Sequence, residues 1–293
     1  MLNAFAENAA VRAAFDEASG ALGQDLWKLA AEGPAEELNR TVNTQPLMLT
    51  AGTAIYRAWQ AAGGPAPQLM AGHSLGEYTA LVAAGAITFK DAVPLVRFRA
   101  QAMQDAVPLG AGAMAAILGL DDDAVRAACA EAAQGEVVEA VNFNAPGQVV
   151  IAGHKAAVER AAAVALKSGA KRALMLPVSA PFHASLLKPA ADKLRAYLAN
   201  IAITSPVVAV INNVDVAMVG DAAGIRDALS RQAASPVRWV ETVRKMAGEG
   251  VTVVAECGPG RVLAGLTKRI EGSMRGLAIT DPSSLEQALE AVR

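Results

Sequence analysis

The segment GHSLG at 72–76 has the residue types of a serine nucleophile held in a tight turn. It lies between an apolar run at 68–71 and a stretch of helical period at 77–86, which is the strand-turn-helix setting of a nucleophile elbow. Glycines on both sides allow the sharp turn, and backbone N–H groups at the start of the helix can hold an oxyanion. This setting predicts that Ser74 is a nucleophile; a glycine-lined turn with an idle serine is the alternative.

A serine hydroxyl needs a base within hydrogen-bond reach, and the chain offers three histidines. His73 adjoins the serine, but neighbours in a tight turn point apart, and His154 lies in a loop that opens a predicted helix; for both we expect structural roles. His183 lies where an inserted subdomain should return the chain to the main domain, in the kind of loop that carries chemistry. We predict that His183 is the base for Ser74; a surface or helix-capping histidine is the alternative.

Arg99 lies on an apolar face of the helix predicted at 91–107. The positions three and four residues away on either side are all apolar: Leu95, Val96, Ala102 and Met103. A guanidinium keeps its proton and is costly to bury without a counter-charge. Arg99 should therefore meet either an internal carboxylate or the anion of a ligand, and a bidentate clamp on a substrate carboxylate is the more specific hypothesis.

An α/β framework must position these candidates. From about Gln68 onward, short apolar runs alternate with stretches of helical period, which indicates a mostly parallel sheet with helices on both faces. Later in the chain, apolar runs at 207–213 and 251–257 alternate with helices predicted at 224–233, 236–248, 261–270 and 284–292. Together with the serine turn, this pattern predicts a hydrolase-like α/β fold.

One stretch breaks this rhythm. Strands are predicted at 113–119, 137–142, 148–152 and 171–178, and helices at 121–133 and 155–168. The resulting order, β-α-β-β-α-β, is typical of a ferredoxin-like fold. We therefore expect a ferredoxin-like α+β subdomain at 109–179, inserted into a discontinuous catalytic domain at 1–108 and 180–293.

Composition restricts the partners and the location. A net charge of -2, from 26 basic and 28 acidic residues, argues against a nucleic-acid-binding surface. No apolar run approaches the roughly 20 residues that a membrane span needs, and no secretory signal is visible, so a cytoplasmic location without membrane association is expected. Cys129 and Cys257 lack CxxC spacing and a nearby histidine cluster, so we expect reduced thiols and no metal.

Several separate motifs follow one another along nearly the whole chain: GPAEELNRT with NTQP, GHSLGEY, Arg99 with Met103-Gln104, NFNAPGQVVIAG, VSAPFH and ECGPGRVL. Together they resemble the malonyl-CoA:acyl carrier protein transacylase family. The resemblance implies a hydrolase-like α/β domain with a ferredoxin-like insert. It also implies transfer of a malonyl group from malonyl-CoA to the phosphopantetheine thiol of acyl carrier protein, with no cofactor beyond the coenzyme A thioester substrate. We also expect a monomer.

The resemblance implies a catalytic dyad. Ser74 would carry the malonyl ester in a ping-pong reaction, and His183 would be its base. The family orients its histidine by a backbone carbonyl rather than by an aspartate, and the matching residue is Gln232 in RQAASPVRW. The dyad would therefore lack an acidic third member.

The resemblance implies a binding pocket as well. Arg99 would hold the malonyl carboxylate, Gln45 of NTQP would line the same pocket, and the backbone N–H of Leu75 would be one oxyanion donor. In the family, a bulky residue after the serine and a phenylalanine before the histidine accompany selectivity for malonyl over branched groups, and Leu75 and Phe182 fit this pattern. A basic surface for the acidic carrier protein is a further hypothesis, with these candidates: Lys167, Lys171, Arg172, Lys268 and Arg269.

The family also begins with a strand and a GQGSQ loop, whose glutamine supplies a second oxyanion N–H. This sequence contains no such strand, and Met1 would match an internal methionine of the family. We therefore expect a truncated start and a slow enzyme, since loss of one oxyanion donor costs on the order of 100- to 1000-fold in rate.

Two other functions share some of these features. An α/β-hydrolase-type esterase or thioesterase has the same serine turn, but its usual order of serine, acid and histidine places the histidine near the end. Here no histidine follows His183, and an esterase has no need of Arg99. The second alternative is an inactive, truncated form that acts only as a binding module.

Overall fold

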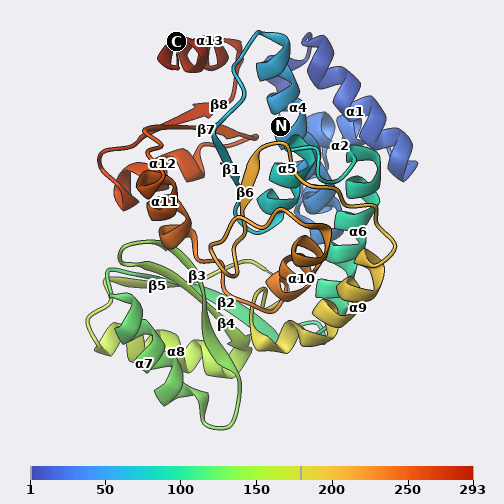
Figure 1. Ribbon diagram of the computed structural model, residues 1–293. Coiled ribbons are helices and arrows are strands. Elements are labelled where there is room, and N and C mark those ends of the chain that lie inside the picture. The colour runs from blue at the N-terminus through green and yellow to red at the C-terminus, as the bar shows by residue number, and fades with distance from the viewer. Residues whose placement is uncertain (1, 179, 293) are drawn as a thin grey trace.

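The computed structural model describes residues 2–178 and 180–292. Met1, which was expected to match an internal methionine of the family, and residue 179, the expected end of the insert, lie outside these ranges. Figure 1 shows a larger part built on parallel strands and helices, and a smaller part with its own sheet and helices, drawn in green at the bottom.

Two pairs of parallel strands form the centre of the larger part. Strand β1 (Leu69–Ala71) pairs with β6 (Ala209–Ile211), and β7 (Val253–Cys257) pairs with β8 (Arg275–Ile279). The parallel direction agrees with the sequence prediction for the main sheet. Strand β8 was not predicted, because its sequence RGLAI is short and begins with a charge and a glycine.

Helices cover both faces of the first strand pair, as predicted. Met70 and Val210 belong to the largest core, whereas Leu69, Ala71 and Ile211 belong to a second core, because successive strand residues point to opposite faces. The largest core includes side chains of α1 (Ala9–Leu22), α4 (Thr41–Ala61), α5 (Leu75–Ala83), α6 (Phe89–Asp105), α9 (Lys188–Leu198), α10 (Ala222–Gln232) and α13 (Pro282–Ala291). The second core includes α11 (Trp239–Gly248) and α12 (Val262–Ile270).

The described residues before β1 are almost entirely helical. Besides α1 and α4, they form η1 (Asn3–Phe5), α2 (Leu26–Glu32) and α3 (Ala35–Asn39). Helix α4 packs closely on α5, since a Cβ added at Gly52 would lie 2.7 Å from Thr79 Cγ2 and 3.2 Å from the Cys257 carbonyl oxygen. A glycine at this position therefore lets α4 approach the helix that follows the serine turn.

The smaller part is an antiparallel sheet in the strand order β3-β4-β2-β5, which is the ferredoxin-like arrangement predicted from the sequence. Its elements are β2 (Gly112–Leu118), α7 (Asp122–Ala133), β3 (Val138–Ala145), β4 (Gln148–His154), α8 (Lys155–Lys167) and β5 (Arg172–Met175). One face packs on α7 and α8 in a core of its own. The other face packs on Phe182 and Ala184, the two neighbours of His183. The boundaries at 109 and 179 stay predictions.

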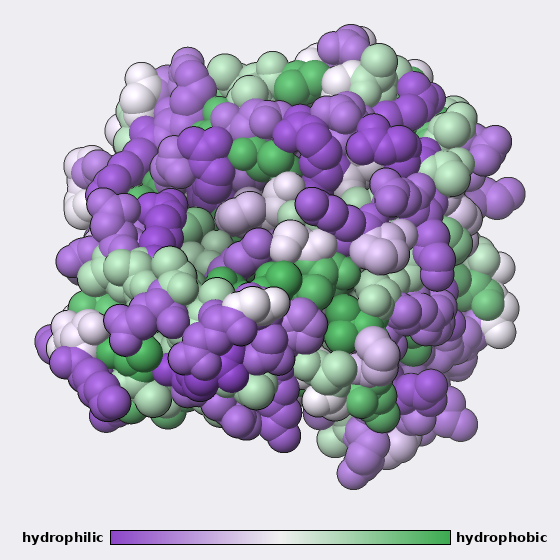
Figure 2. Space-filling model, turned by 90° about the horizontal axis from the view of Figure 1, so that it is seen from below, coloured by the Kyte–Doolittle hydropathy of each residue, from purple (hydrophilic) through white to green (hydrophobic). Residues whose placement is uncertain are grey.

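Figure 2 shows one face of the molecule covered mainly by hydrophilic residues, with hydrophobic residues in small separate groups. Within residues 2–178 and 180–292, no helix combines the length and the hydropathy of a bilayer-spanning segment.

Candidate active site

The serine turn joins β1 to α5 and places Ser74 just before the first residue of the helix. Ser74 has φ 52° and ψ −107°, a conformation that is strained for a residue with a side chain. The turn also needs a glycine at position 72, because a Cβ there would lie 1.9 Å from the carbonyl carbon of Gly76. These residues therefore form the tight elbow that the sequence predicts.

Asn213 holds the elbow from the neighbouring strand. It follows β6, the parallel neighbour of β1, and therefore lies at the same carboxyl edge. Its Oδ1 accepts the N–H of Ser74 at 2.7 Å, and its Nδ2 donates to the carbonyl of Gly72 at 2.8 Å. The Ser74 N–H is thus occupied, whereas the N–H of Leu75, in the first helical turn, has no acceptor within the helix. The Leu75 N–H is the one suited to an oxyanion.

His183 lies against the serine hydroxyl. Its Nε2 is 2.7 Å from Ser74 Oγ, and its Nδ1 is 2.9 Å from the backbone oxygen of Gln232. A carbonyl only accepts, so Nδ1 carries the proton and Nε2 is left to accept the proton of the serine. His183 is buried, and burial, with a contribution from the charge of Arg99, lowers its pKa to about 3. The imidazole is therefore neutral near pH 7, as a base must be.

Arg99 is almost completely buried, with 2% of its surface exposed, beside the same hydroxyl. Its Nη1 donates to Gln45 Oε1 at 2.7 Å, and its Nη2 donates to Gln232 Oε1 at 2.9 Å and to Ser74 Oγ at 3.0 Å. No carboxylate in residues 2–178 and 180–292 forms an ion pair with it. Of the two partners that the sequence allowed, a carboxylate in direct contact is thus absent from the described residues, although the charge of Glu77 acts on Arg99 without an ion pair.

A second layer of polar groups joins these residues. The Nε2 of Gln232 donates to the backbone oxygen of Ser74 at 3.0 Å and to Glu77 Oε2 at 2.8 Å. Glu77 Oε2 also accepts the backbone N–H of Asn213 at 2.9 Å. Burial raises the pKa of Glu77 to about 7, although both hydrogen bonds and the charge of Arg99 act in the opposite direction. Glu77 therefore lies between its neutral and charged forms near pH 7.

Sequence reasoning missed Glu77 and Asn213. Asn213 has a signal in retrospect, because two asparagines directly follow an apolar strand, at the sheet edge where ligands bind in α/β folds. Glu77 has almost none, since an acidic residue in the first turn of a helix is common for helix stability alone.

The chain matches the family described as acyl transferase domain over residues 2–273. It belongs to this family. It is 59% identical over 280 residues to the malonyl CoA-acyl carrier protein transacylase of Escherichia coli strain K12, which covers 96% of this chain and 91% of that protein. These matches confirm the family that the separate motifs indicated.

Solved structures of acyltransferases agree in fold. The crystal structure of an acyl-carrier-protein S-malonyltransferase from Burkholderia pseudomallei 1710b is 69% identical, with a TM-score of 0.97, and the match covers 99% of this chain and 94% of that one. A malonyl-transacylase in complex with its type II polyketide acyl carrier protein is 54% identical, with a TM-score of 0.96 over 98% of this chain and 93% of that one. The predicted fold class is thereby confirmed.

The other two histidines of this acyltransferase-family chain lie outside the serine site. His73 Nε2 is 2.8 Å from Asn144 Oδ1, and its ring lies 5.7 Å from that of Trp239. His154 accepts the backbone N–H of Val137 at 3.0 Å. In the described structure neither forms a hydrogen bond to the serine hydroxyl, although the charge of His73 acts on His183, and their structural roles stay a prediction.

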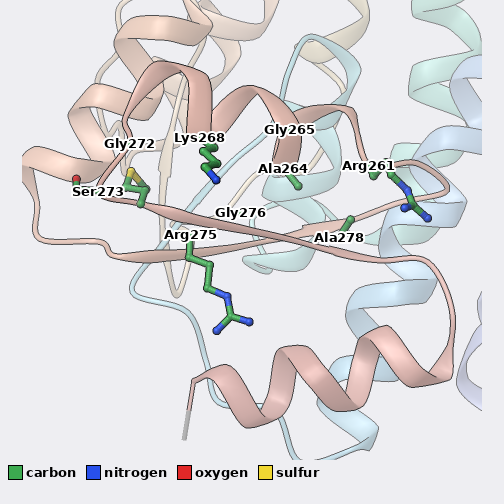
Figure 3. Close-up of a pocket in the computed structure, with 10 residues that line it drawn as sticks. Arg261, Ala264, Gly265, Lys268, Gly272, Ser273, Arg275, Gly276 and Ala278 are labelled. Atoms are coloured by element: carbon green, nitrogen blue, oxygen red, sulfur yellow. The ribbon is translucent and has the colours of Figure 1, made fainter.

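One surface pocket is separate from this site. It has a volume of about 650 Å³ and lies between α12 and β8, and no residue of the serine site lines it. Figure 3 shows that its basic side chains do not converge, since Arg275 points away from α12 while Lys268 points from α12 toward the strands.

Of the predicted basic docking surface, Lys268 and Arg269 lie on α12, and the other three residues are exposed at the end of α8 and the start of β5. Docking there stays a prediction.

Proposed function

We propose that this chain transfers a malonyl group from malonyl-CoA to the phosphopantetheine thiol of acyl carrier protein, through an ester on Ser74. The observation that carries the proposal is the double contact of Ser74 Oγ, with His183 Nε2 at 2.7 Å and Arg99 Nη2 at 3.0 Å. A base and a buried cation that forms no ion pair within the described residues thus meet at one hydroxyl. The named activity of the Escherichia coli relative supports the same conclusion.

Acylation would follow from this geometry. Nε2 of His183 accepts the Ser74 proton while Oγ attacks the thioester carbonyl, and the oxyanion forms near the N–H of Leu75. The tetrahedral intermediate then collapses, the carbon–sulfur bond breaks, and coenzyme A leaves as a thiol with the proton from His183. Gln232 keeps the imidazole in the required tautomer through its backbone oxygen. No acidic third residue is required.

The second half-reaction reverses these steps. The phosphopantetheine thiol of the carrier gives its proton to His183 and attacks the ester, and Ser74 regains its proton when the ester bond breaks. The acyl group arrives and leaves on thiols, so the proposed reaction uses no further cofactor. Residues 2–178 and 180–292 contain no group of three or more His, Cys, Asp or Glu side chains placed to hold a metal ion.

Arg99 would select the substrate by its free carboxylate. Its two terminal nitrogens match the two oxygens of a carboxylate, and Gln45 lies beside Nη1. Because the site is buried, an acyl group without the negative charge would leave the guanidinium uncompensated. Bulk at Leu75 and Phe182 would disfavour branched acyl groups.

Several further expectations belong to the same proposal. Cys129 and Cys257 are free thiols, as is usual in a reducing compartment, and we propose a cytoplasmic location, to be checked by cell fractionation.

The division at 109 and 179 would place Ser74 and Arg99 before the insert and His183 after it. The monomeric state is part of the proposal and can be measured by light scattering.

Intact-mass measurement tests the proposal. After mixing with malonyl-CoA, the wild-type chain should gain one malonyl group, and addition of phosphopantetheinylated carrier protein should move that group to the carrier. Ser74→Ala should gain nothing, whereas the exposed control Ser283→Ala should behave like wild type. Loss of the group to water instead of the carrier would identify an esterase, and malonylation of Ser74→Ala at the wild-type rate would refute the proposal.

A further inference from the structure

The side-chain amide of Gln232 has two different ends, and the site uses each for a different task. Its Oε1 accepts a hydrogen bond from Arg99 Nη2 at 2.9 Å. Its Nε2 donates to the backbone oxygen of Ser74 and to Glu77 Oε2. A flipped amide would direct N–H donors at the donors of Arg99, so the orientation of Gln232 decides whether Arg99 keeps its partner.

Glu77 is the side chain whose carboxyl group faces the donor end of this amide. A carboxylate oxygen attracts the amide N–H end and repels the carbonyl end, and Oε2 lies 2.8 Å from Nε2 of Gln232. Glu77 itself is fixed, since 98% of its surface is buried and the backbone N–H of Asn213 donates to the same oxygen at 2.9 Å. The neighbouring backbone oxygen of Ser74 adds a second acceptor for Nε2 at 3.0 Å.

We propose that Glu77 is a positioning residue that acts through Gln232: it holds the amide so that Arg99 keeps the geometry needed to recognise the carboxylate of the acyl group. The inference rests on the proposed function, in which Arg99 binds that carboxylate. Glu77 forms no direct hydrogen bond to Arg99 in the described structure, so its effect passes through one side chain.

The charges around Glu77 fit this role. Arg99 faces it from α6, Tyr78 adjoins it on α5, and Asp215 lies beyond Asn213 in the loop after β6. The positive charge of Arg99 favours the ionised carboxylate, whereas burial favours the neutral acid. Because Gln232 needs only an acceptor at this point, an amide oxygen at position 77 could replace the carboxylate.

Substitutions at position 77 separate positioning from general stability. Glu77→Ala should reduce kcat/KM for malonyl-CoA by roughly tenfold to a hundredfold, since it frees the Gln232 amide and leaves a buried donor unpaired. Acylation by acetyl-CoA, which has no free carboxylate, should fall by no more than about threefold. Glu77→Gln should recover malonyl-CoA activity to within about threefold of wild type. The control Asp91→Ala removes a first-turn carboxylate from α6 and should leave the ratio of the two substrates unchanged.

A second variant keeps the test decisive if Glu77→Ala does not fold. Gln232→Ala retains the backbone oxygen for His183 but removes the amide, so it should shift the malonyl-to-acetyl ratio in the same direction. Where Glu77→Ala does fold, the double variant Glu77→Ala/Gln232→Ala should be no worse than Gln232→Ala, because Glu77 acts on Arg99 through the Gln232 amide.

The outcomes distinguish this inference from the proposed function. If the wild-type chain gains no malonyl group, the proposed function is wrong. If wild type is malonylated but Glu77→Ala loses malonyl-CoA and acetyl-CoA activity equally, or if Glu77→Gln fails to recover it in a folded protein, the positioning role is wrong and the function stands.

Discussion

Arg99 donates a hydrogen bond to the Ser74 hydroxyl, with 3.0 Å between Nη2 and Oγ, and the acceptor nitrogen of His183 lies 2.7 Å from the same oxygen. In the absence of substrate, the cation therefore stabilises negative charge on the serine oxygen and disfavours a protonated imidazole. Once a substrate carboxylate binds the guanidinium, its charge is compensated, so substrate recognition and proton transfer are electrostatically linked at this atom.

Arg99→Ala should lose activity with malonyl-CoA by about 100-fold more than activity with acetyl-CoA, because removal of a desolvated charge partner costs a few kcal/mol. Steady-state kinetics with both substrates measures the ratio. Arg97→Ala is the matched control, since Arg97 donates to Asn43 and Gln24 and forms no hydrogen bond with Ser74 in the described structure. An equal loss for both substrates would mean that Arg99 is a structural residue.

Gly72→Ala should prevent the elbow from forming, because the new methyl group would lie 2.0 Å from the carbonyl oxygen of Gly76. We expect the purified variant to unfold at a clearly lower temperature and to gain no malonyl group. Gly76→Ala is the control within the same motif, since its Cβ has no neighbour within 4 Å. The unfolding temperatures of Gly72→Ala and Gly76→Ala are compared by thermal unfolding. Equal temperatures would show that the turn can rearrange to accommodate an alanine at position 72.

Asn213→Ala should slow acylation and destabilise the fold by about 1–3 kcal/mol, because it leaves the partly buried N–H of Ser74 and the carbonyl of Gly72 without their partner. Urea unfolding gives the free energy, and intact mass against time gives the acylation rate. Asn212→Ala is the control, since Asn212 Oδ1 binds only the N–H of Asp215 in its own loop. The idea fails if both variants acylate at the same rate.

Two buried groups should give the free energy of unfolding opposite dependences on pH. The pKa of His183 is about 3 in the fold and ordinarily 6.5, so the unfolded chain binds more protons between these values and stability falls as pH falls through that window. The pKa of Glu77 is about 7 in the fold and ordinarily 4.5, so the folded chain binds more protons and stability falls as pH rises through that window.

Single substitutions separate these two effects. Glu77→Gln should remove the loss of stability between about pH 5 and pH 7, and His183→Gln should remove the loss on acidification below about pH 6, each on the order of 1–3 kcal/mol. The free energy of unfolding of wild type, Glu77→Gln and His183→Gln is measured by urea titration at a series of pH values that spans both windows. Parallel curves for wild type and both variants would show that neither group titrates differently on folding.

Local pattern was enough to predict much of the fold and the principal site residues. The glycine spacing around Ser74 and its strand and helix predicted the elbow, and the alternation from 113 to 178 predicted the insert because each of its strands and helices has a clear period. Arg99 was found because a charge on an apolar helix face is a local signal.

The hydrogen-bond network behind the site could not be found in this way. Glu77 meets Asn213 across 136 positions and Gln232 across 155, and a contact over such distances leaves no trace in the local sequence. For Gln232, the sequence indicated only a backbone role, whereas its side chain joins Arg99, Ser74 and Glu77. Likewise, only the three-dimensional structure shows that Arg99 forms no direct ion pair with a carboxylate of the described residues.

The insert has a consequence for the order of folding. Ser74 and His183 are 109 positions apart, and bringing the ends of so long a loop together costs conformational entropy. Pairing of β2 with β5 closes most of this loop. Just beyond β5, the backbone N–H of Leu176 donates to the carbonyl oxygen of Met114 at 2.9 Å. We therefore expect the insert to fold before Ser74 and His183 come into contact. A chain interrupted during synthesis or folding before that point would hold Ser74 without its base.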